Sequence, residues 1–433
     1  MKRNDIRRRK RIFQKSICLL LSMAMLLTGS VSVFAADPGG NAGSEQRAEA
    51  ARSVRFSDTA GHWAAEYIGE GVEKSWINGY PNGTFRPQNT ITRAEFVKLI
   101  LSAMKLTPGS ENAKYLDALE LMTKDDKPYD VTPLSDVKAH WVTTGGYMDI
   151  ALKYGMVINA EYSGEKFQPD KAITRREIAV MAMRALGLVY PSKTTKEKSN
   201  YSDAADYPDW LQGYLTMTEK TGVIEGYPDG SFRGENTATR AEALTIVSRV
   251  MEEMEQSIDD SAEIYATVKR YNSDEEREYW KEPVPQELSV PLLKIGGVFY
   301  ADGRDLYKIS EKNCTNGVGD SLNPIRKIRW WPEEQKMRYA IDWHTTEYTA
   351  GNSQMRDIVV NSEDWGTDIY DIAAPKMLYG HLMIPVYDEM RAREVSDIEG
   401  KSYNIEAWTE WRTICEEGNR LTMYVNSQYR RIS

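Results

Sequence analysis

Residues that commonly build metal sites and disulfides are scarce in this sequence: it has three cysteines and four histidines among 433 residues. Only Cys314 and Cys415 lie outside the N-terminal apolar run, and two thiols alone make an incomplete metal site. Neither His-Glu-x-x-His, Cys-x-x-Cys nor Gly-x-Ser-x-Gly occurs. We therefore predict no metal, no cofactor and no catalytic residues. A Cys314–Cys415 disulfide and two free thiols both remain open.

Long apolar runs are also lacking, because no segment reaches the roughly 20 residues that a membrane-spanning helix needs. The longest run, residues 17–27, follows a cluster of Lys and Arg and precedes small residues that end at Ala35 and Ala36. This pattern predicts a signal peptide over residues 1–36, followed by a linker over 37–53. The mature protein is expected to be exported and to lack a membrane span.

Positive charge is concentrated in that N-terminal segment. Residues 1–15 carry a net charge of +7, so subtracting this from the total of −9 leaves −16 for the rest of the chain. Nucleic-acid binding depends on neutralising phosphates with Lys and Arg, so we predict no nucleic-acid partner.

Three internal repeats dominate the sequence that follows. The tetrapeptide Thr-Arg-(Ala/Arg)-Glu occurs at residues 92–95, 174–177 and 239–242, each time before an apolar helical pattern. Upstream of each copy lie a Ser-Asp pair and then a Trp, always in the same order. Each repeat is predicted to be a helix, a structured loop and a second helix, the first helix of repeat 1 spanning residues 62–77.

The tetrapeptide has a physical explanation except at its Arg. Thr and Glu three residues apart form a capping box, which satisfies backbone N–H groups at a helix start. A cation in the first helical turn is mildly disfavoured by the helix dipole. The recurrence of Arg93, Arg175 and Arg240 therefore needs a reason other than helix capping.

The loops of repeats 1 and 3 contain a recognisable turn. It reads Gly-Tyr-Pro-Asn-Gly-Thr-Phe at residues 79–85 and Gly-Tyr-Pro-Asp-Gly-Ser-Phe at residues 226–232. Gly83 and Gly230 are expected to adopt a positive φ. Repeat 2 lacks this turn over residues 158–167, so we expect one or two working ligand grooves rather than three.

This set of motifs resembles the S-layer homology (SLH) domain, in three tandem copies over residues 54–104, 131–188 and 199–250. The resemblance implies a pseudo-trimer of helix–loop–helix repeats around a central three-helix bundle. It also implies grooves that bind anionic, often pyruvylated, secondary cell-wall polysaccharide. The implied function is noncovalent anchoring at the surface of a Gram-positive-type cell wall.

The ligand-binding residues that this resemblance implies recur from repeat to repeat: Arg93, Arg175, Arg240, Asp58, Asp136, Asp203, Trp63, Trp141, Trp210, Gly83 and Gly230. Each group has a structural alternative. The Asp residues suit helix N-caps, the Trp residues suit core anchors, and the Arg residues suit salt bridges to a neighbouring repeat.

The remaining segments carry weaker signals. Residues 105–130 are predicted to be an insertion on the surface with a short helix near residues 115–122. The charged residues 251–290 are predicted to be an acidic spacer, or near their start a continuation of the last repeat helix. Residues 291–433 show short runs of strand-forming residues and predict a mostly β domain of no recognised family. The fold class is thus multidomain, an α-rich half followed by a β half.

Two other functions remain open at this point. One is a wall-anchored hydrolase with its active site in residues 291–433, for which Asp342, His344 and His381 are the thin cluster of candidates. The other is a self-assembling S-layer subunit; the oligomeric state is not predicted. Six of the eleven Trp lie in residues 291–433, where they are predicted to fill the core rather than to stack on sugars.

Overall fold

The computed structural model describes residues 56–162, 166–189, 198–256, 258, 264–271, 284–306, 328–341, 344–360, 365–390, 393–396, 402–407, 411–416 and 420–426. The predicted signal peptide, the linker 37–53 and Cys314 lie outside these residues. The side chains of Cys415, Asp342 and His344 do so as well.

Residues 56–256, here called the helical half, contain the three repeats. Its α-helices are α3 (Ala65–Glu73), α4 (Arg93–Ala103), α5 (Glu111–Asp117), α6 (Trp141–Thr144), α7 (Tyr147–Tyr154), α8 (Arg175–Ala185), α10 (Asp209–Thr221) and α11 (Arg240–Gln256). Two short 3-10 helices are η2 (Asn159–Glu161) and η4 (Ala204–Asp206). The first helix of repeat 1, α3, is shorter than the predicted 62–77.

The second helix of each repeat begins at its capping box, as predicted. In repeat 1 the backbone N–H of Thr92 donates to Glu95 Oε2 at 2.8 Å, and the N–H of Glu95 donates to Thr92 Oγ1 at 3.2 Å. Thr239 and Glu242 exchange the same two bonds in repeat 3. A capping box joins Thr174 and Glu177 in repeat 2.

Backbone hydrogen bonds connect the three repeats in a ring just before these helices. The N–H of Ile91 donates to Ala238 O, that of Ala238 to Ile173 O, and that of Ile173 to Ile91 O, over 3.0–3.2 Å. Helices α4, α8 and α11, which start beyond this ring, contact one another. Each repeat therefore depends on the other two for its place.

Residues 264–426, here called the β half, are mostly β, as predicted. The strands are β2 (Ile264–Tyr271), β3 (Val284–Ile295), β4 (Val298–Asp302), β5 (Ile328–Trp331), β6 (Lys336–Ile341), β7 (His344–Thr349), β8 (Gln354–Val360), β9 (Trp365–Asp371), β10 (Lys376–Leu378), β11 (His381–Asp388), β12 (Arg393–Ser396), β13 (Ser402–Ala407), β14 (Trp411–Glu416) and β15 (Arg420–Asn426). They form a six-stranded sheet, β1-β5-β6-β7-β8-β9, and a nine-stranded sheet, β10-β11-β4-β3-β2-β15-β14-β13-β12. Trp330 and Trp331 are buried, in line with a core role.

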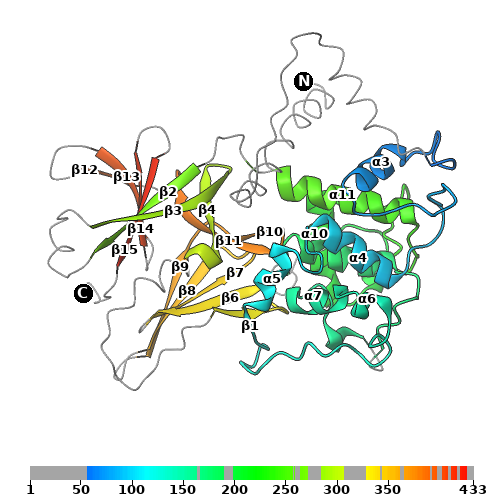
Figure 1. Cartoon of the computed structure of the whole chain (residues 1–433), viewed down its shortest axis with the longest axis horizontal. Helices are drawn as coiled ribbons and strands as arrows, with labels where there is room; N and C mark the ends of the chain where they lie inside the picture. The colour runs from blue at the N-terminus through cyan, green and yellow to red at the C-terminus, as the bar shows by residue number, and fades with distance from the viewer. Residues whose placement is uncertain are drawn as a thin grey trace, which may run out of the picture.

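The insertion over residues 105–130 lies partly at the surface, but it is also packed against the rest of the protein. After helix α5, which buries Tyr115 and Leu116, strand β1 (Glu120–Leu121) pairs in parallel with β5 of the six-stranded sheet. The insertion thus joins the repeats to the β half, and α5 and β1 lie where helices and strands meet in Figure 1.

The prediction of an acidic spacer over residues 251–290 does not hold for the residues of this segment that the structure describes. Helix α11 continues to Gln256, which confirms the alternative of a helical extension. Strand β2 then lies inside the nine-stranded sheet, between β3 and β15. The many charged residues of segment 251–290 led us to predict a spacer rather than a strand. The inward-facing residues of β2, Ala266 and Val268, are fully buried.

The β half packs against the C-terminal ends of the three central repeat helices. The contacts are Gly380 against Leu106 after α4, Gln335 Nε2 donating to Arg184 O of α8 at 2.9 Å, and the Tyr379 hydroxyl donating to Glu255 of α11. One hydrophobic core runs through both halves. Helices and strands accordingly occupy opposite sides of the molecule but share an interior (Figure 1).

Candidate functional site

The Asp of each Ser-Asp pair holds the loop of its own repeat. Each carboxylate accepts two backbone N–H groups, one from the loop Phe and one from the next residue. The donors are Phe85 and Arg86 to Asp58, Phe167 and Gln168 to Asp136, and Phe232 and Arg233 to Asp203, all over 2.6–3.0 Å. These Asp residues are therefore loop anchors, not helix N-caps.

The residue after each loop Phe has an unusual backbone. Arg86, Gln168 and Arg233 have φ values of 56°, 54° and 53°, a region that non-glycine residues rarely adopt. Desolvation raises the pKa of the Asp58 and Asp203 carboxyls, but the backbone donors outweigh it and leave both pKa values below the ordinary value. The ionised carboxylate thus stabilises a strained turn.

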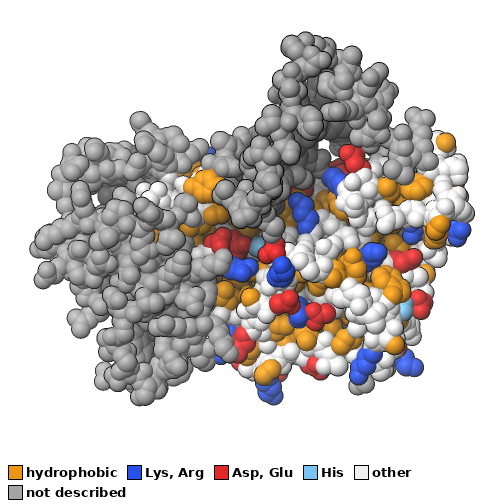
Figure 2. All heavy atoms as spheres, in the orientation of Figure 1, with side chains coloured by type: hydrophobic (Ala, Val, Ile, Leu, Met, Phe, Trp, Pro, Cys, Tyr) orange, Lys and Arg blue, Asp and Glu red, His pale blue; other side chains and the backbone are white. Residues whose placement is uncertain are grey.

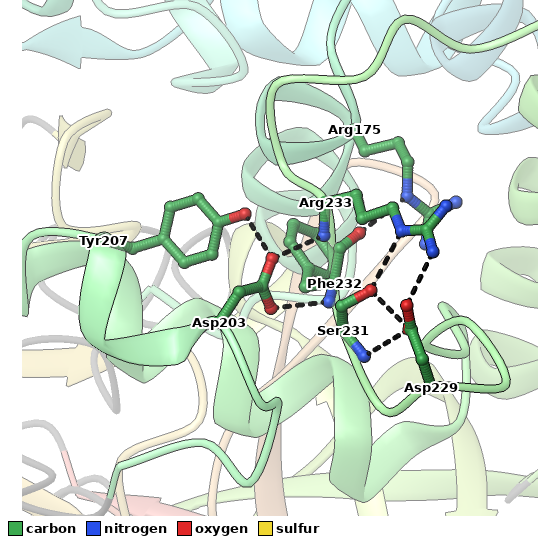
Figure 3. A network of polar contacts seen from close by, with 7 residues as sticks. All are labelled: Arg175, Asp203, Tyr207, Asp229, Ser231, Phe232 and Arg233. Atoms are coloured by element: carbon green, nitrogen blue, oxygen red, sulfur yellow. Dashed lines mark hydrogen bonds and ion pairs between the residues drawn. The ribbon is translucent and has the colours of Figure 1, made fainter.

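Figure 3 shows this network in repeat 3. Asp203 also accepts a hydrogen bond from the Tyr207 hydroxyl at 2.8 Å. On the other side of the loop, the guanidinium of Arg233 donates to Asp229 Oδ2 at 2.6 Å and to Ser231 Oγ at 3.0 Å. Gly230, between them, has a φ of 78°, as predicted, and Gly83 has the matching value of 77° in repeat 1.

The Arg of each tetrapeptide reaches into the loop of the following repeat. Its guanidinium donates to backbone carbonyls there: Arg93 to Phe167 O, Arg175 to Phe232 O and Glu225 O, and Arg240 to Phe85 O and Asn78 O, over 2.6–3.1 Å. Arg93 also pairs with Glu177 of repeat 2.

These three guanidinium groups are not exposed. The Arg residues are 5–8% accessible. Arg175 and Arg240 each lie over the Tyr and the Phe of the loop that they reach, and Arg93 lies over Tyr162. The expectation of a guanidinium standing open to ligand does not match this geometry. The structural alternative, a contact to the neighbouring repeat, is present in all three, although only Arg93 makes it as a close salt bridge.

Repeat 2 keeps the aromatic framework despite its missing turn. Arg93 lies over the ring of Tyr162 and donates to Phe167 O. In the same way, Arg175 lies over the ring of Tyr227 and donates to Phe232 O. The sequence signal that could have shown this is the constant spacing of five residues between Tyr and Phe in all three loops. We missed it because the turn residues between them differ.

The Trp of each repeat stays at the surface. Trp63, Trp141 and Trp210 are 58%, 42% and 53% exposed, so the core-anchor alternative is wrong for all three. Trp63 and Trp141 each lie against the preceding His ring, at 5.4 and 5.3 Å between centroids. Among the described residues of the helical half, these Trp are the most exposed large apolar side chains.

The described residues hold no group of three His, Cys, Asp or Glu arranged for a metal ion. Of the three candidate residues Asp342, His344 and His381, only His381 has a side chain that the structure describes. Its Nδ1 lies 2.5 Å from Asp302 Oδ2, and its Nε2 lies 3.2 Å from Asn112 Oδ1 of helix α5. His381 therefore belongs to the contact between the two halves. No described helix is long and apolar enough to cross a membrane.

Comparison with known proteins agrees with this repeat geometry. The model of the S-layer homology domain matches residues 55–97, 133–179 and 200–244. The chain carries three tandem SLH domains. No family model matches its C-terminal region.

Similar proteins include a cellulosome-anchoring protein of Acetivibrio thermocellus, 31% identical over 42% of this chain and 37% of that protein. A surface layer protein of Brevibacillus choshinensis is 33% identical over 25% of this chain and 10% of that protein. Exoglucanase XynX of A. thermocellus is 27% identical over 46% of this chain and 16% of its own length. The match thus spans well under half of each of these relatives. SLH domains and these relatives place the protein at the cell wall or cell surface of a Gram-positive-type bacterium.

Proposed function

We propose that the protein is a noncovalent wall anchor whose SLH domains bind an anionic, pyruvylated secondary cell-wall polysaccharide and display the β half at the cell surface. The observation that carries this proposal is the exposure of Trp63, Trp141 and Trp210 at matching positions of three repeats. An exposed indole has no role in the core, whereas its flat apolar face suits a sugar ring with a wet outer edge.

The connections between repeats support a pseudo-trimer around α4, α8 and α11 as the framework of this anchor. The backbone ring at Ile91, Ile173 and Ala238 and the cyclic order of the Arg contacts both follow a threefold pattern. In this proposal a polymer meets several equivalent junctions, which raises its residence time through effective concentration.

The candidate residues then divide into two roles. The Trp residues stack on the sugar, and the turns at Gly83 and Gly230 let the loop backbone approach it, since a Cβ at Gly83 would have no atom within 4 Å. The Asp and Arg residues position these loops: the Asp holds the loop from its own repeat and the Arg holds it from the preceding one. Lysines and arginines are interspersed with acids on the face drawn in Figure 2, so anion selection depends on local partners.

The test is retention of the mature full-length chain by pyruvylated wall material. Replacing Trp63, Trp141 and Trp210 with Ala together is expected to abolish retention, because each stacking contact contributes about 1 kcal/mol, or roughly fivefold in affinity. Tyr265→Ala is the matched control, since this exposed aromatic lies in the β half. Full retention of the folded triple variant would remove the proposal.

Because one similar protein is named an exoglucanase, the alternative of a wall-anchored hydrolase is also tested by experiment. Incubation of the full chain with wall glycans and peptides, followed by mass spectrometry, is expected to show no cleavage products. Cleavage would favour a wall-anchored hydrolase over a display protein.

A further inference from the structure

His62 and His140 directly precede the exposed Trp of repeats 1 and 2. Each imidazole ring lies against the indole that follows it, with 5.4 Å between the ring centroids at Trp63 and 5.3 Å at Trp141. The planes of the two rings are tilted by 33° and 43°, so the rings are in contact but not fully stacked. Because the two Trp are still 58% and 42% exposed, each His covers only part of the indole and leaves the rest open to solvent.

The first nitrogen of each imidazole is held by the backbone. The N–H of Ala64 donates to His62 Nδ1 at 3.1 Å, and the N–H of Val142 donates to His140 Nδ1 at 3.3 Å. Both N–H groups lie in the first helical turn, where a backbone donor has no partner within the helix itself. The imidazole therefore caps the turn that carries the Trp.

The second nitrogen is held by the loop of the same repeat. His62 Nε2 is hydrogen-bonded to the side-chain amide of Gln88 at 2.8 Å, and His140 Nε2 is hydrogen-bonded to Asp170 Oδ1 at 3.2 Å. Gln88 and Asp170 occupy matching positions, the third residue after the loop Phe of each repeat. An imidazole that turned away from its indole would lose hydrogen bonds at both nitrogens, so the position of the Trp is tied to the loop.

Repeat 3 lacks this arrangement. Asp209 precedes Trp210, and the N-cap of helix α10 is Pro208, which makes no side-chain hydrogen bond to the helix. Glu235, the third residue after the loop Phe, instead forms a salt bridge at 2.6 Å to an Arg of α8. The indole of Trp210 meets Tyr214 of its own helix edge-on, with 6.5 Å between the centroids. Trp210 thus has neither the imidazole nor its two hydrogen bonds.

A restrained indole binds a sugar better than a free one. An exposed Trp has two side-chain torsions, and a ligand that stacks on it must immobilise both, which weakens binding. At Trp63 and Trp141 the adjoining imidazole already restricts these torsions in the free protein. The same ligand contacts are therefore expected to yield more affinity there than at Trp210.

We propose that His62 and His140 are positioning residues for carbohydrate binding: each fixes the Trp that follows it, and repeats 1 and 2 consequently bind the wall polymer more tightly than repeat 3. The ligand that this arrangement recognises is the apolar face of a pyranose ring, which stacks on the indole. Neither His needs to touch the sugar. This inference rests on the proposed function and assigns unequal contributions to its three Trp.

The double variant His62→Asn/His140→Asn separates positioning from helix capping. Asparagine is a favoured capping residue, because its side-chain oxygen accepts a backbone N–H of the first turn, but it has no ring to lie against the indole. The affinity of the mature full-length chain for pyruvylated wall material, titrated in pull-down assays, is expected to fall about tenfold, or about threefold at each repeat. Asp209→Asn is the matched control in repeat 3 and is expected to leave the affinity unchanged. Natural affinity in the double variant would mean that the two His only cap their turns, and would overturn the proposal.

Fluorine NMR of the chain labelled with 5-fluorotryptophan reports directly on the indoles, whether or not the variant changes stability. Trp63→Phe, Trp141→Phe and Trp210→Phe assign the three resonances. In the natural chain, transverse relaxation is expected to be fast at Trp63 and Trp141, which move with the protein, and slower at Trp210, which moves independently. The double Asn variant is expected to bring all three to the slower rate. A Trp210 as rigid as the other two, or no change in the double variant, would overturn the positioning role.

Single replacements rank the three sites. Trp63→Ala and Trp141→Ala are expected to lower the affinity about tenfold each, and Trp210→Ala about threefold. An equal or larger loss in Trp210→Ala would contradict the ranking. If the triple Trp replacement abolishes retention while the His variants and the ranking fail, anchoring stands without these positioning residues. If the triple variant is retained in full, the anchor proposal itself fails.

Discussion

Replacing Asp203 with Ala tests whether the Ser-Asp motif is part of the framework or contacts ligand directly. The carboxylate accepts from the N–H of Phe232 at 2.6 Å, the N–H of Arg233 at 2.8 Å and the hydroxyl of Tyr207 at 2.8 Å. A hydrogen bond to a charged group contributes roughly 1.5–3 kcal/mol, but this carboxylate is half-buried and the N–H of Arg233 can be rehydrated. We therefore expect a loss of about 2 kcal/mol rather than the sum of three bonds.

Thermal unfolding of the full chain measures this loss, and hydrogen exchange locates it. Because one core joins the two halves, they are expected to unfold together, and a loss of this size in a unit of about 370 residues lowers the midpoint by about 3 °C. Amides in residues 226–236 are expected to exchange faster. Asp206→Ala is the control, because this exposed carboxylate lies three residues away and removes the same charge. Equal midpoints for the two variants, with unchanged exchange in the loop, would refute the framework role.

Two further predictions concern the contact between the halves and the effect of acid. Gly155→Ala is expected to lower the urea midpoint far more than Gly222→Ala: both have a positive φ, but only a Cβ at Gly155 would meet backbone, 2.0 Å from Pro332 O. Equal midpoints would contradict the contact between the halves. Because the folded pKa values of Asp58 and Asp203 are depressed, their stabilisation is full above about pH 4 and is lost as pH falls through the folded values. Loop amides whose protection, corrected for the intrinsic pH dependence of exchange, does not fall as acid is added would contradict this.

The sequence was sufficient for the repeats because each motif is governed by local chemistry. A capping box and a turn with glycine at a positive φ depend on residues a few positions apart, and both formed where predicted. The β half was predicted only as a class, since its sheet order depends on pairings between segments far apart in the chain, such as β2 with β15.

The roles of Arg93, Arg175 and Arg240 show where local reasoning stops. We argued that helix capping does not need these residues and inferred a ligand. In the structure these Arg side chains donate hydrogen bonds to the backbone carbonyl groups of Phe167, Phe232 and Phe85. Each carbonyl lies beside the strained turn of the next repeat. A buried carbonyl without a donor is costly, and this donor comes from another repeat, so no window of sequence within one repeat contains both partners.

The position of the β half relative to the loops follows from the direction of the repeat helices. The loops adjoin the N-terminal ends of α4, α8 and α11, whereas the β half contacts the C-terminal ends. With 11 residues, α4 separates these two surfaces by about 16 Å at 1.5 Å per residue. Gly380 lies so close to Leu106 that a Cβ at position 380 would be 2.7 Å from the Leu106 side chain. The two halves are therefore in tight contact here. If the loops bind the wall, the β half must therefore face away from it, and its orientation is set by the repeats themselves rather than by a spacer.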